Sequence, residues 1–165
     1  MQLSITKALP TDINTIQSLI QRIWKPTYQH ILSEAQMEYM LKMMYSTEVL
    51  EKQFETGHQF LLMHLNDESV GFAGFQLDYE KEGVTKLHKI YLLPETQGKN
   101  AGKTLFNEVT GIAKNAGQQR LILNVNRYNK AFAFYQKLGM QIAEEVDVEI
   151  GNGYFMNDYI MSIDL

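Results

Sequence analysis

The sequence predicts one α/β (α+β) domain, in which helices cover both faces of a mixed, mostly antiparallel twisted sheet of about seven strands. Two observations support this prediction. Strand patterns joined by turn residues form hairpins towards both ends of the chain, and strand and helix patterns alternate between them. With 165 residues, 45% of them hydrophobic, and no linker-like stretch or internal repeat, the chain has the size of a single domain spanning residues 1–165.

The N-terminal part begins with a strand and a helix. Leu3 and Ile5 alternate with polar residues, which is typical of a half-buried strand. Apolar residues then recur at spacings of three and four over residues 13–24, and this stripe predicts a helix that stops before Pro26.

Ser33 begins a capping-box pattern that predicts a second helix, and Thr47 is expected to cap a short third helix that ends near Gly57. Apolar runs over 59–65 and 70–77, separated by polar turn residues, predict a hairpin. The later elements are a strand over 87–93, a helix over 105–113, a strand over 121–125, a helix over 131–138 that Asn129 caps, and a hairpin of 141–150 with 154–163.

Composition excludes several classes of protein. A formal net charge of −4 argues against a nucleic-acid partner, because such a protein needs a concentrated basic face. The chain has no cysteine, which excludes disulfides and thiolate nucleophiles. No stretch approaches the roughly 18 apolar residues of a membrane span and the N-terminus lacks a signal-peptide core, so we expect a cytoplasmic protein with no membrane partner.

The stretch from Lys86 to Leu105 organises the rest of the chain. It reads as an apolar strand, a proline, a short loop with glycines and lysines, and the first turn of a helix. Such a loop presents backbone N–H groups and a helix N-terminus to an anion, which predicts a phosphate-bearing cofactor. Residues 98–104 nearly match a P-loop, although three residues rather than four separate the glycines. A P-loop-like phosphotransferase therefore remains an alternative.

Residues 86–140 resemble the GNAT superfamily of acyl-CoA N-acyltransferases. The resemblance rests on a strand ending in Tyr-Leu-Leu-Pro, the loop Glu-Thr-Gln-Gly-Lys-Asn-Ala-Gly-Lys, and the downstream run Asn-Lys-Ala-Phe-Ala-Phe-Tyr. The predicted order of elements is also similar to that family from end to end. The resemblance implies a GNAT-like fold and transfer of an acetyl group from acetyl-CoA to a primary amine by direct attack, with no metal. A CoA-binding module without catalysis is a further alternative.

In that family the loop reads Gln or Arg, two residues, Gly, one residue, then Gly or Ala, and its backbone amides hold the pyrophosphate of coenzyme A. Gln97, Asn100 and Gly102 stand at these places. Asn100 departs from the usual glycine, but asparagine tolerates a positive φ better than other non-glycine residues. The cofactor-binding residues that the resemblance implies are Ile90, Leu92, Leu93, Gln97, Gly98, Lys99, Asn100, Ala101, Gly102, Lys103, Asn129 and Tyr135.

Two residues are candidates for proton transfer. Tyr135 falls where a tyrosine of the family donates a proton to the departing thiolate, although core packing would also explain it. His88 would share one face of a regular strand with Ile90 and Leu92, where its imidazole could relay a proton as a base. A structural histidine satisfied by a neighbour is the alternative. Other candidate bases are Glu34, Glu38 and Asp158, each expected on the solvated surface.

The acceptor is expected to be a small-molecule amine or a peptide N-terminus. The family builds its acceptor wall from the region between the first two helices, and the C-terminal hairpin could close the other wall. The residues assigned to acceptor binding are Trp24, Tyr28, Glu34, Tyr154 and Phe155. Their aromatic and acidic character suits a cationic amine, as in the polyamine acetyltransferase-like branch that this chain resembles. Met40, Met44 and Tyr45 would form a lid, a homodimer surface or ordinary helix packing.

Overall fold

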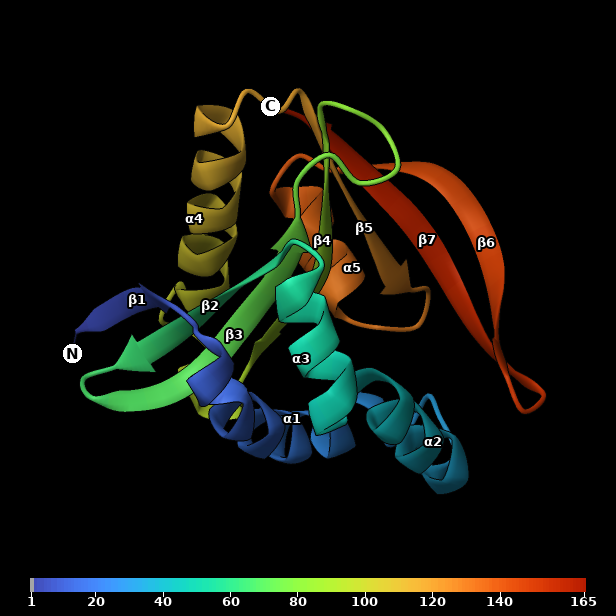
Figure 1. Ribbon diagram of the computed structural model, residues 1–165. Helices are drawn as coiled ribbons and strands as arrows, with labels where there is room; N and C mark the ends of the chain where they lie inside the picture. The colour runs from blue at the N-terminus through green and yellow to red at the C-terminus, as the bar shows by residue number, and fades with distance from the viewer. Residues whose placement is uncertain (1) are drawn as a thin grey trace.

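The computed structural model describes residues 2–165, so only Met1 of the predicted domain lies outside the described residues. The strands form one sheet with the order β1-β2-β3-β4-β5-β7-β6 (Figure 1). The strands are β1 (Leu3–Lys7), β2 (His58–Leu65), β3 (Glu68–Gln76), β4 (Val84–Leu92), β5 (Arg120–Asn126), β6 (Gln141–Gly151) and β7 (Tyr154–Asp164). Only β4 and β5 run parallel to each other, and the other neighbouring pairs are antiparallel.

Helices pack on both faces of this sheet (Figure 1), which confirms the predicted fold class. They are α1 (Ile13–Tyr28), α2 (Glu34–Tyr45), α3 (Thr47–Glu55), α4 (Ala101–Asn115) and α5 (Ala131–Lys137), with short 3-10 turns at Pro10–Asp12 and Pro94–Thr96. Large side chains such as Trp24, Phe60, Phe72 and Phe75 are fully buried between helices and sheet. Each contributes roughly 2–3 kcal/mol through removal of apolar surface from water.

Helix α1 continues through Pro26 to Tyr28, so the expectation that it stops before the proline is wrong. A proline removes one helical hydrogen bond, here the bond to the carbonyl of the exposed residue Arg22. The bond from Gln29 N–H to Lys25 O, 3.0 Å long, still closes the last turn. The last turn also buries Tyr28, which offsets the lost bond and places its hydroxyl inside the molecule.

The cap of α2 agrees with the sequence and that of α3 differs, while at α5 the predicted residue binds the first helical N–H from one position before the N-cap, Lys130. The Ser33 hydroxyl accepts from Gln36 N–H at 3.1 Å at the start of α2. Asn129 Oδ1 accepts from Ala131 N–H at 2.9 Å at the start of α5. Helix α3 is capped by Ser46 and not by Thr47, since it is the Ser46 hydroxyl that accepts from the N–H at the third helical position. The two residues are adjacent and chemically similar, so composition alone does not separate them.

Candidate active site

Strands β4 and β5 pair only at one end. Their parallel register runs from Val84 with Arg120 to Leu87 with Leu123, and the remaining halves of both strands are unpaired with each other. Strand β5 stays paired with β7 over its whole length, which draws it away from β4. The result is a wedge between the two strands, bounded by residues 88–92 and 124–126. Unpaired main-chain groups along such an opening can bind an extended ligand.

Strand β4 carries a β-bulge at His88, because the residues on either side of it pair with adjacent residues of β3. The expectation that His88 stays in phase with Ile90 and Leu92 on a regular strand is therefore wrong. The His88 ring stacks on His58 at a centroid distance of 4.7 Å, and its Nε2 lies 3.3 Å from Gln76 Oε1. These contacts match the alternative of a histidine held by its neighbours.

The surroundings of His88 also determine its protonation. Burial lowers its pKa most, and the charges of His58, Lys86 and Lys89 add to the effect, so that the pKa falls to about 3. The imidazole is thus neutral at physiological pH. A group with so low a pKa is a weak proton acceptor, because catalytic bases work best with a pKa near the working pH.

The loop after β4 leads directly from the wedge into α4. Gly98 has a φ of +80° and Asn100, which precedes the first residue of α4, has a φ of 57°. Asn100 therefore adopts the left-handed conformation expected where the family has glycine. The first N–H groups of α4 have no partner within the helix. Together with the exposed Gly98, beside whose Cβ position no atom lies within 4 Å, they fit an anionic phosphate group.

Gly102 has a packing role that the sequence did not indicate. A Cβ atom added there would lie 3.2 Å from Cζ of Phe134 and 3.5 Å from Cδ1 of Leu92. The glycine thus allows α4, α5 and the end of β4 to approach one another closely. A larger side chain would disturb the helix packing as well as the loop.

Tyr28 and Asn129 meet beside the wedge. Asn129 Nδ2 donates to the Tyr28 hydroxyl at 3.4 Å, and that hydroxyl lies 3.4 Å from the hydroxyl of Tyr91 on β4. Trp24 packs against the Tyr28 ring at a centroid distance of 4.9 Å. Trp24 is only 1% exposed, so it supports Tyr28 from the core and does not itself form an open wall.

Tyr135 is buried on α5, 6% exposed, with its ring 5.3 Å from the ring of Phe134 and 6.4 Å from that of Phe106. Burial, with a smaller contribution from Tyr28, raises the pKa of Tyr135 far above its usual value. The phenol therefore stays protonated and can act as a proton donor. The Tyr135 ring also packs against Phe134 and Phe106, so the residue is part of the hydrophobic core as well.

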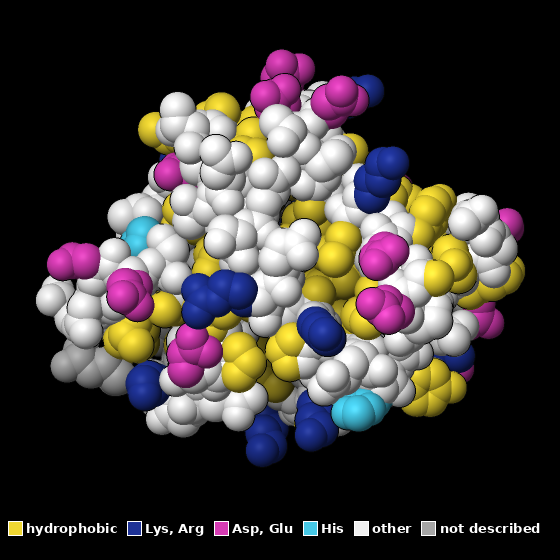
Figure 2. All heavy atoms as spheres, turned by 90° about the horizontal axis from the view of Figure 1, so that it is seen from below, with side chains coloured by type: hydrophobic (Ala, Val, Ile, Leu, Met, Phe, Trp, Pro, Cys, Tyr) yellow, Lys and Arg dark blue, Asp and Glu magenta, His cyan; other side chains and the backbone are white. Residues whose placement is uncertain are grey.

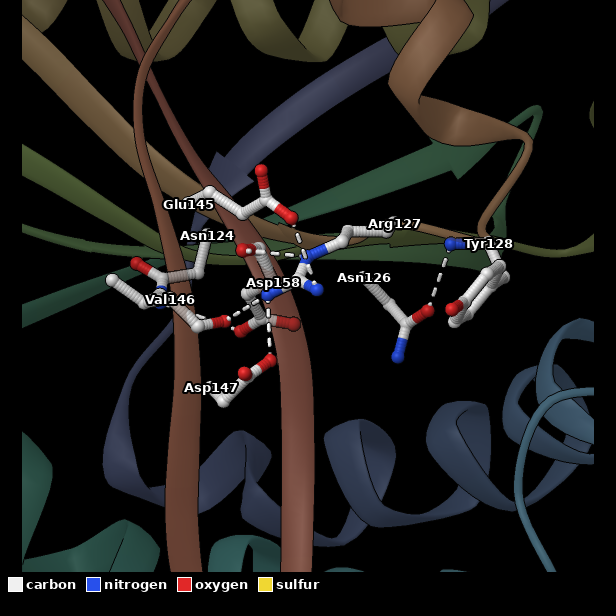
Figure 3. Close-up of polar contacts among 8 residues, drawn as sticks. All are labelled: Asn124, Asn126, Arg127, Tyr128, Glu145, Val146, Asp147 and Asp158. Carbon is white, nitrogen blue, oxygen red and sulfur yellow. Dashed lines mark hydrogen bonds and ion pairs between the residues drawn. The ribbon is translucent and has the colours of Figure 1, made fainter.

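A polar cluster lies on β5, β6 and β7 and on the residues that follow β5 (Figure 3). Asp158 on β7 is 6% exposed, so the expectation that it lies on the solvated surface is wrong. The residue is enclosed because β7 is inserted between β5 and β6. Asn124 Nδ2 donates to Asp158 Oδ2 at 3.3 Å, and Lys86 Nζ donates to Asn124 Oδ1 at 2.7 Å. Glu34 and Glu38 on α2 are exposed, as expected.

Helix α2 meets the β6–β7 hairpin, which brings the two predicted acceptor walls together (Figure 1). Tyr39 donates its hydroxyl to Ile150 O at 2.9 Å, and its ring lies 5.5 Å from that of Tyr154. Gln36 Nε2 donates to Phe155 O at 3.1 Å, while the Phe155 side chain is 50% exposed. Figure 2 shows hydrophobic side chains in a hollow of this lower face, with charged groups at its rim.

A family model described as the acetyltransferase (GNAT) family matches residues 18–140. This chain belongs to the GNAT acetyltransferase family. It is an acetyl-CoA-dependent N-acetyltransferase, as the sequence predicted, and the alternatives of a P-loop phosphotransferase and of a non-catalytic module are set aside.

Several relatives resemble this GNAT acetyltransferase. A spermidine N(1)-acetyltransferase of Thermoplasma acidophilum is 30% identical over 150 residues, which cover 87% of this chain and 91% of that protein. The crystal structure of the PaiA N-acetyltransferase of Thermoplasma acidophilum in complex with coenzyme A is 29% identical, with a TM-score of 0.83 and full coverage of both chains. A GCN5-related N-acetyltransferase of Rhodopseudomonas palustris, 19% identical with a TM-score of 0.84, covers 100% of this chain and 97% of its own and supports the fold.

Sequence reasoning missed Lys89, a buried cation of this acetyltransferase on β4. The residue is 4% exposed, its Nζ donates to Gln53 Oε1 at 2.7 Å, and the rings of Tyr45 and Phe60 lie 4.7 and 5.3 Å from Nζ. Burial lowers the pKa of Lys89 to about 7. The sequence does show a lysine within an apolar strand. Because the bulge at His88 changes the alternation of side chains, the sequence could not predict that Lys89 lies on the buried face.

Met40 and Tyr45 of the acetyltransferase are 1% and 4% exposed and Met44 is half-buried, which matches the alternative of ordinary helix packing. No helix within residues 2–165 is long and apolar enough to cross a membrane. In the same range, His, Cys, Asp and Glu side chains form no group of three that could hold a metal ion.

Proposed function

We propose that this acetyltransferase acetylates a primary amine of a polyamine-like cation. The observation that carries the proposal is the contact between α2 and the β6–β7 hairpin beside the wedge. In this region Tyr39 packs on Tyr154, and Tyr154 and Asp158 lie on the same face of β7, so an aromatic and an acidic group are available for an incoming cation. The 30% identity to a spermidine N(1)-acetyltransferase supports the same class of acceptor.

We propose that the wedge and the loop after it hold acetyl-CoA. The main chain of Ile90, Leu92 and Leu93 would accompany the pantetheine arm, because this part of β4 is unpaired toward β5. Residues 97–103 would hold the pyrophosphate through backbone N–H groups and the N-terminus of α4. The lysines at positions 99 and 103 add positive charge beside that anion. The bound cofactor supplies an activated acetyl thioester.

The Tyr135 phenol is proposed as the acid that protonates the departing thiolate. It lies on α5 near Tyr28 and remains protonated because it is buried. Asn129 holds the start of α5 through its cap and fixes the Tyr28 hydroxyl through its amide group. His88 is proposed as a structural support of the bulge rather than as the base, because its pKa of about 3 leaves it little affinity for a proton.

The test is a competition assay with acetyl-CoA and equal concentrations of spermidine, a free amino acid, an aminoglycoside and a peptide with a free N-terminus. The products are separated and identified by mass spectrometry. We expect acetylated spermidine to dominate. Dominant acetylation of the peptide would replace the proposed acceptor class, and absence of any acetylated amine would contradict the proposal.

A further inference from the structure

The carboxylate of Asp158 has two oxygens in different surroundings. Oδ2 accepts from Asn124, whereas Oδ1 is buried and has no hydrogen-bond partner within residues 2–165. A buried carboxylate oxygen without a donor is unfavourable, and such atoms are rare in native proteins. This one indicates that a ligand supplies the missing donor.

Asp158 lies on β7 beside the open end of the wedge, where the proposed function puts the acceptor. It pairs with Asn126 at the end of β5, and the bonds from Lys86 to Asn124 and from Asn124 to Asp158 link β4 to β7 across the base of the wedge. Burial raises the pKa of Tyr28, and the negative charge of Asp158 adds a smaller increase, so the carboxylate lies within electrostatic reach of the Tyr28 hydroxyl.

The cations around Asp158 leave Oδ1 free. Arg127 binds Asp147 Oδ1 at 2.6 Å, Glu145 Oε1 at 3.2 Å and Val146 O at 2.9 Å (Figure 3). Toward Asp158 it contacts only the main-chain oxygen, at 3.4 Å. Lys86 is occupied by Asn124. Arg127 and Lys86 therefore lie near the Asp158 carboxylate, but neither donates a hydrogen bond to Oδ1.

These charges also set the proton affinity of Asp158. Burial raises the pKa of its carboxyl, while the bond from Asn124 and the charges of Lys86 and Arg127 lower it by a smaller amount. On β6, Glu145 and Asp147 form ion pairs with Arg127, whose one positive charge balances one of the two carboxylates. A carboxylate with a raised pKa is better suited to accept a proton than an exposed one.

We propose that Oδ1 of Asp158 receives the primary ammonium of the acceptor and takes the proton that must leave before the nitrogen attacks. The inference rests on the proposed function. The ammonium gives one proton to Oδ1, and the neutral nitrogen then forms its bond to the acetyl carbon while the carbon–sulfur bond breaks. Tyr135 protonates the sulfur and recovers a proton from the acetylated nitrogen. Asp158 releases its proton to solvent, so the products are the N-acetylamine, the thiol and one proton.

The decisive variant is Asp158→Asn, which keeps the side-chain volume and removes the charge. At pH 7 we expect kcat/KM for spermidine to fall about 100-fold or more, the usual contribution of a general base. The dissociation constant of acetyl-CoA should stay within about twofold, because Oδ1 lies on the acceptor side. Asp164→Asn is the control, since it removes one charge from the same strand at a side chain that is 91% exposed.

Two readouts separate proton transfer from a structural role. The deficit of Asp158→Asn should shrink as the pH rises toward the pKa of the amine, and an acceptor whose amine is already neutral at pH 7 should react at nearly the wild-type rate. A structural role would slow both acceptors equally at every pH, and that result would overturn the inference. A wild-type kcat/KM for spermidine at pH 7 would overturn it as well.

If Asp158→Asn fails to fold, the inference can still be tested by a direct measurement on the wild-type protein. The NMR shift of the Asp158 carboxyl carbon should move on titration with spermidine, and an unchanged shift at saturation would overturn the inference. The two proposals fail separately. If the wild-type enzyme acetylates no amine, the proposed function fails, whereas acetylation of spermidine without dependence on Asp158 removes only the role of Asp158.

Discussion

The amide of Asn129 donates to the hydroxyl of Tyr28 at 3.4 Å and thereby joins the start of α5 to the end of α1 beside the wedge. The same side chain accepts from Ala131 N–H through Oδ1 at 2.9 Å. Asn129 thus binds the first N–H group of α5, the helix that carries Tyr135, and also positions Tyr28, which is predicted to bind the acceptor. The two roles use different atoms, so they can be separated by substitution.

Asn129→Asp should separate them. Aspartate keeps the oxygen that caps α5 but lacks the N–H groups that reach Tyr28, so the free energy of unfolding should change by less than about 0.5 kcal/mol. Asn129→Ala should lose about 1 kcal/mol, because it also removes the cap. Urea denaturation measures both. Equal losses in the two variants would show that the cap contributes nothing.

Tyr135→Phe tests the proposed acid. Removing the hydroxyl should lower kcat about 100-fold or more while the acetyl-CoA dissociation constant stays within about twofold. The ring contacts with Phe134 and Phe106 remain in the variant, so folding should be preserved. Tyr128→Phe is the matched control, because Tyr128 is 69% exposed. Unchanged turnover in Tyr135→Phe would leave core packing as its only role.

The conformation of Asn100 makes a prediction about the loop. With φ at 57°, Asn100→Gly should preserve cofactor binding, whereas Asn100→Ala should cost about 1 kcal/mol in strain and raise the acetyl-CoA dissociation constant several-fold. Isothermal titration calorimetry compares the three proteins. If alanine binds as well as glycine, the left-handed conformation does not matter for the cofactor.

Gly102→Val should affect both the cofactor and the packing of α5, because its side chain would meet Phe134. We expect a higher acetyl-CoA dissociation constant together with a lower free energy of unfolding, by about 1–3 kcal/mol. Adding Phe134→Leu makes space beside position 102 and should recover part of the stability. Weakened binding with unchanged stability would show that only the backbone approach to the pyrophosphate is lost.

Lys89 predicts an unusual pH dependence of stability. Burial lowers the pKa of Lys89 from 10.5 to about 7 in the folded protein. Between pH 7 and pH 10.5 the unfolded chain therefore binds one proton more at Lys89 than the folded chain does. The contribution of Lys89 to the free energy of unfolding rises with pH over this range. Below pH 7 the cost of the buried charge is fully present. Lys89→Met should therefore stabilise the protein most near pH 6, by an amount that shrinks toward pH 10. Urea denaturation across this range measures the difference, and a pH-independent difference would contradict the lowered pKa.

The predictable part of the fold was local or shared with the family. The Ser33 cap, the stripe of α1 and the turn Gly151–Gly153 follow from residues close together in the sequence, and all three occur in the structure. Pro26 shows the limit of such rules, because burial of Tyr28 outweighs the lost hydrogen bond.

The unpredicted part of the site depends on contacts between distant segments. The bulge at His88 results from the register between β3 and β4, and alternation along β4 alone could not reveal it. Asp158 is enclosed only because β7 lies between β5 and β6. The loop motif likewise could not predict that Gly102 packs against Phe134, because the two residues lie far apart in the sequence.

Amide hydrogen exchange with and without acetyl-CoA tests most directly whether the wedge between β4 and β5 is the cofactor site. We predict added protection at residues 90–93 and 98–103, with little change in the groove between α1 and α2 that Gln17, Gln21 and Glu38 line. Protection centred on that groove, with none along β4 and the loop, would show that acetyl-CoA does not bind in the wedge.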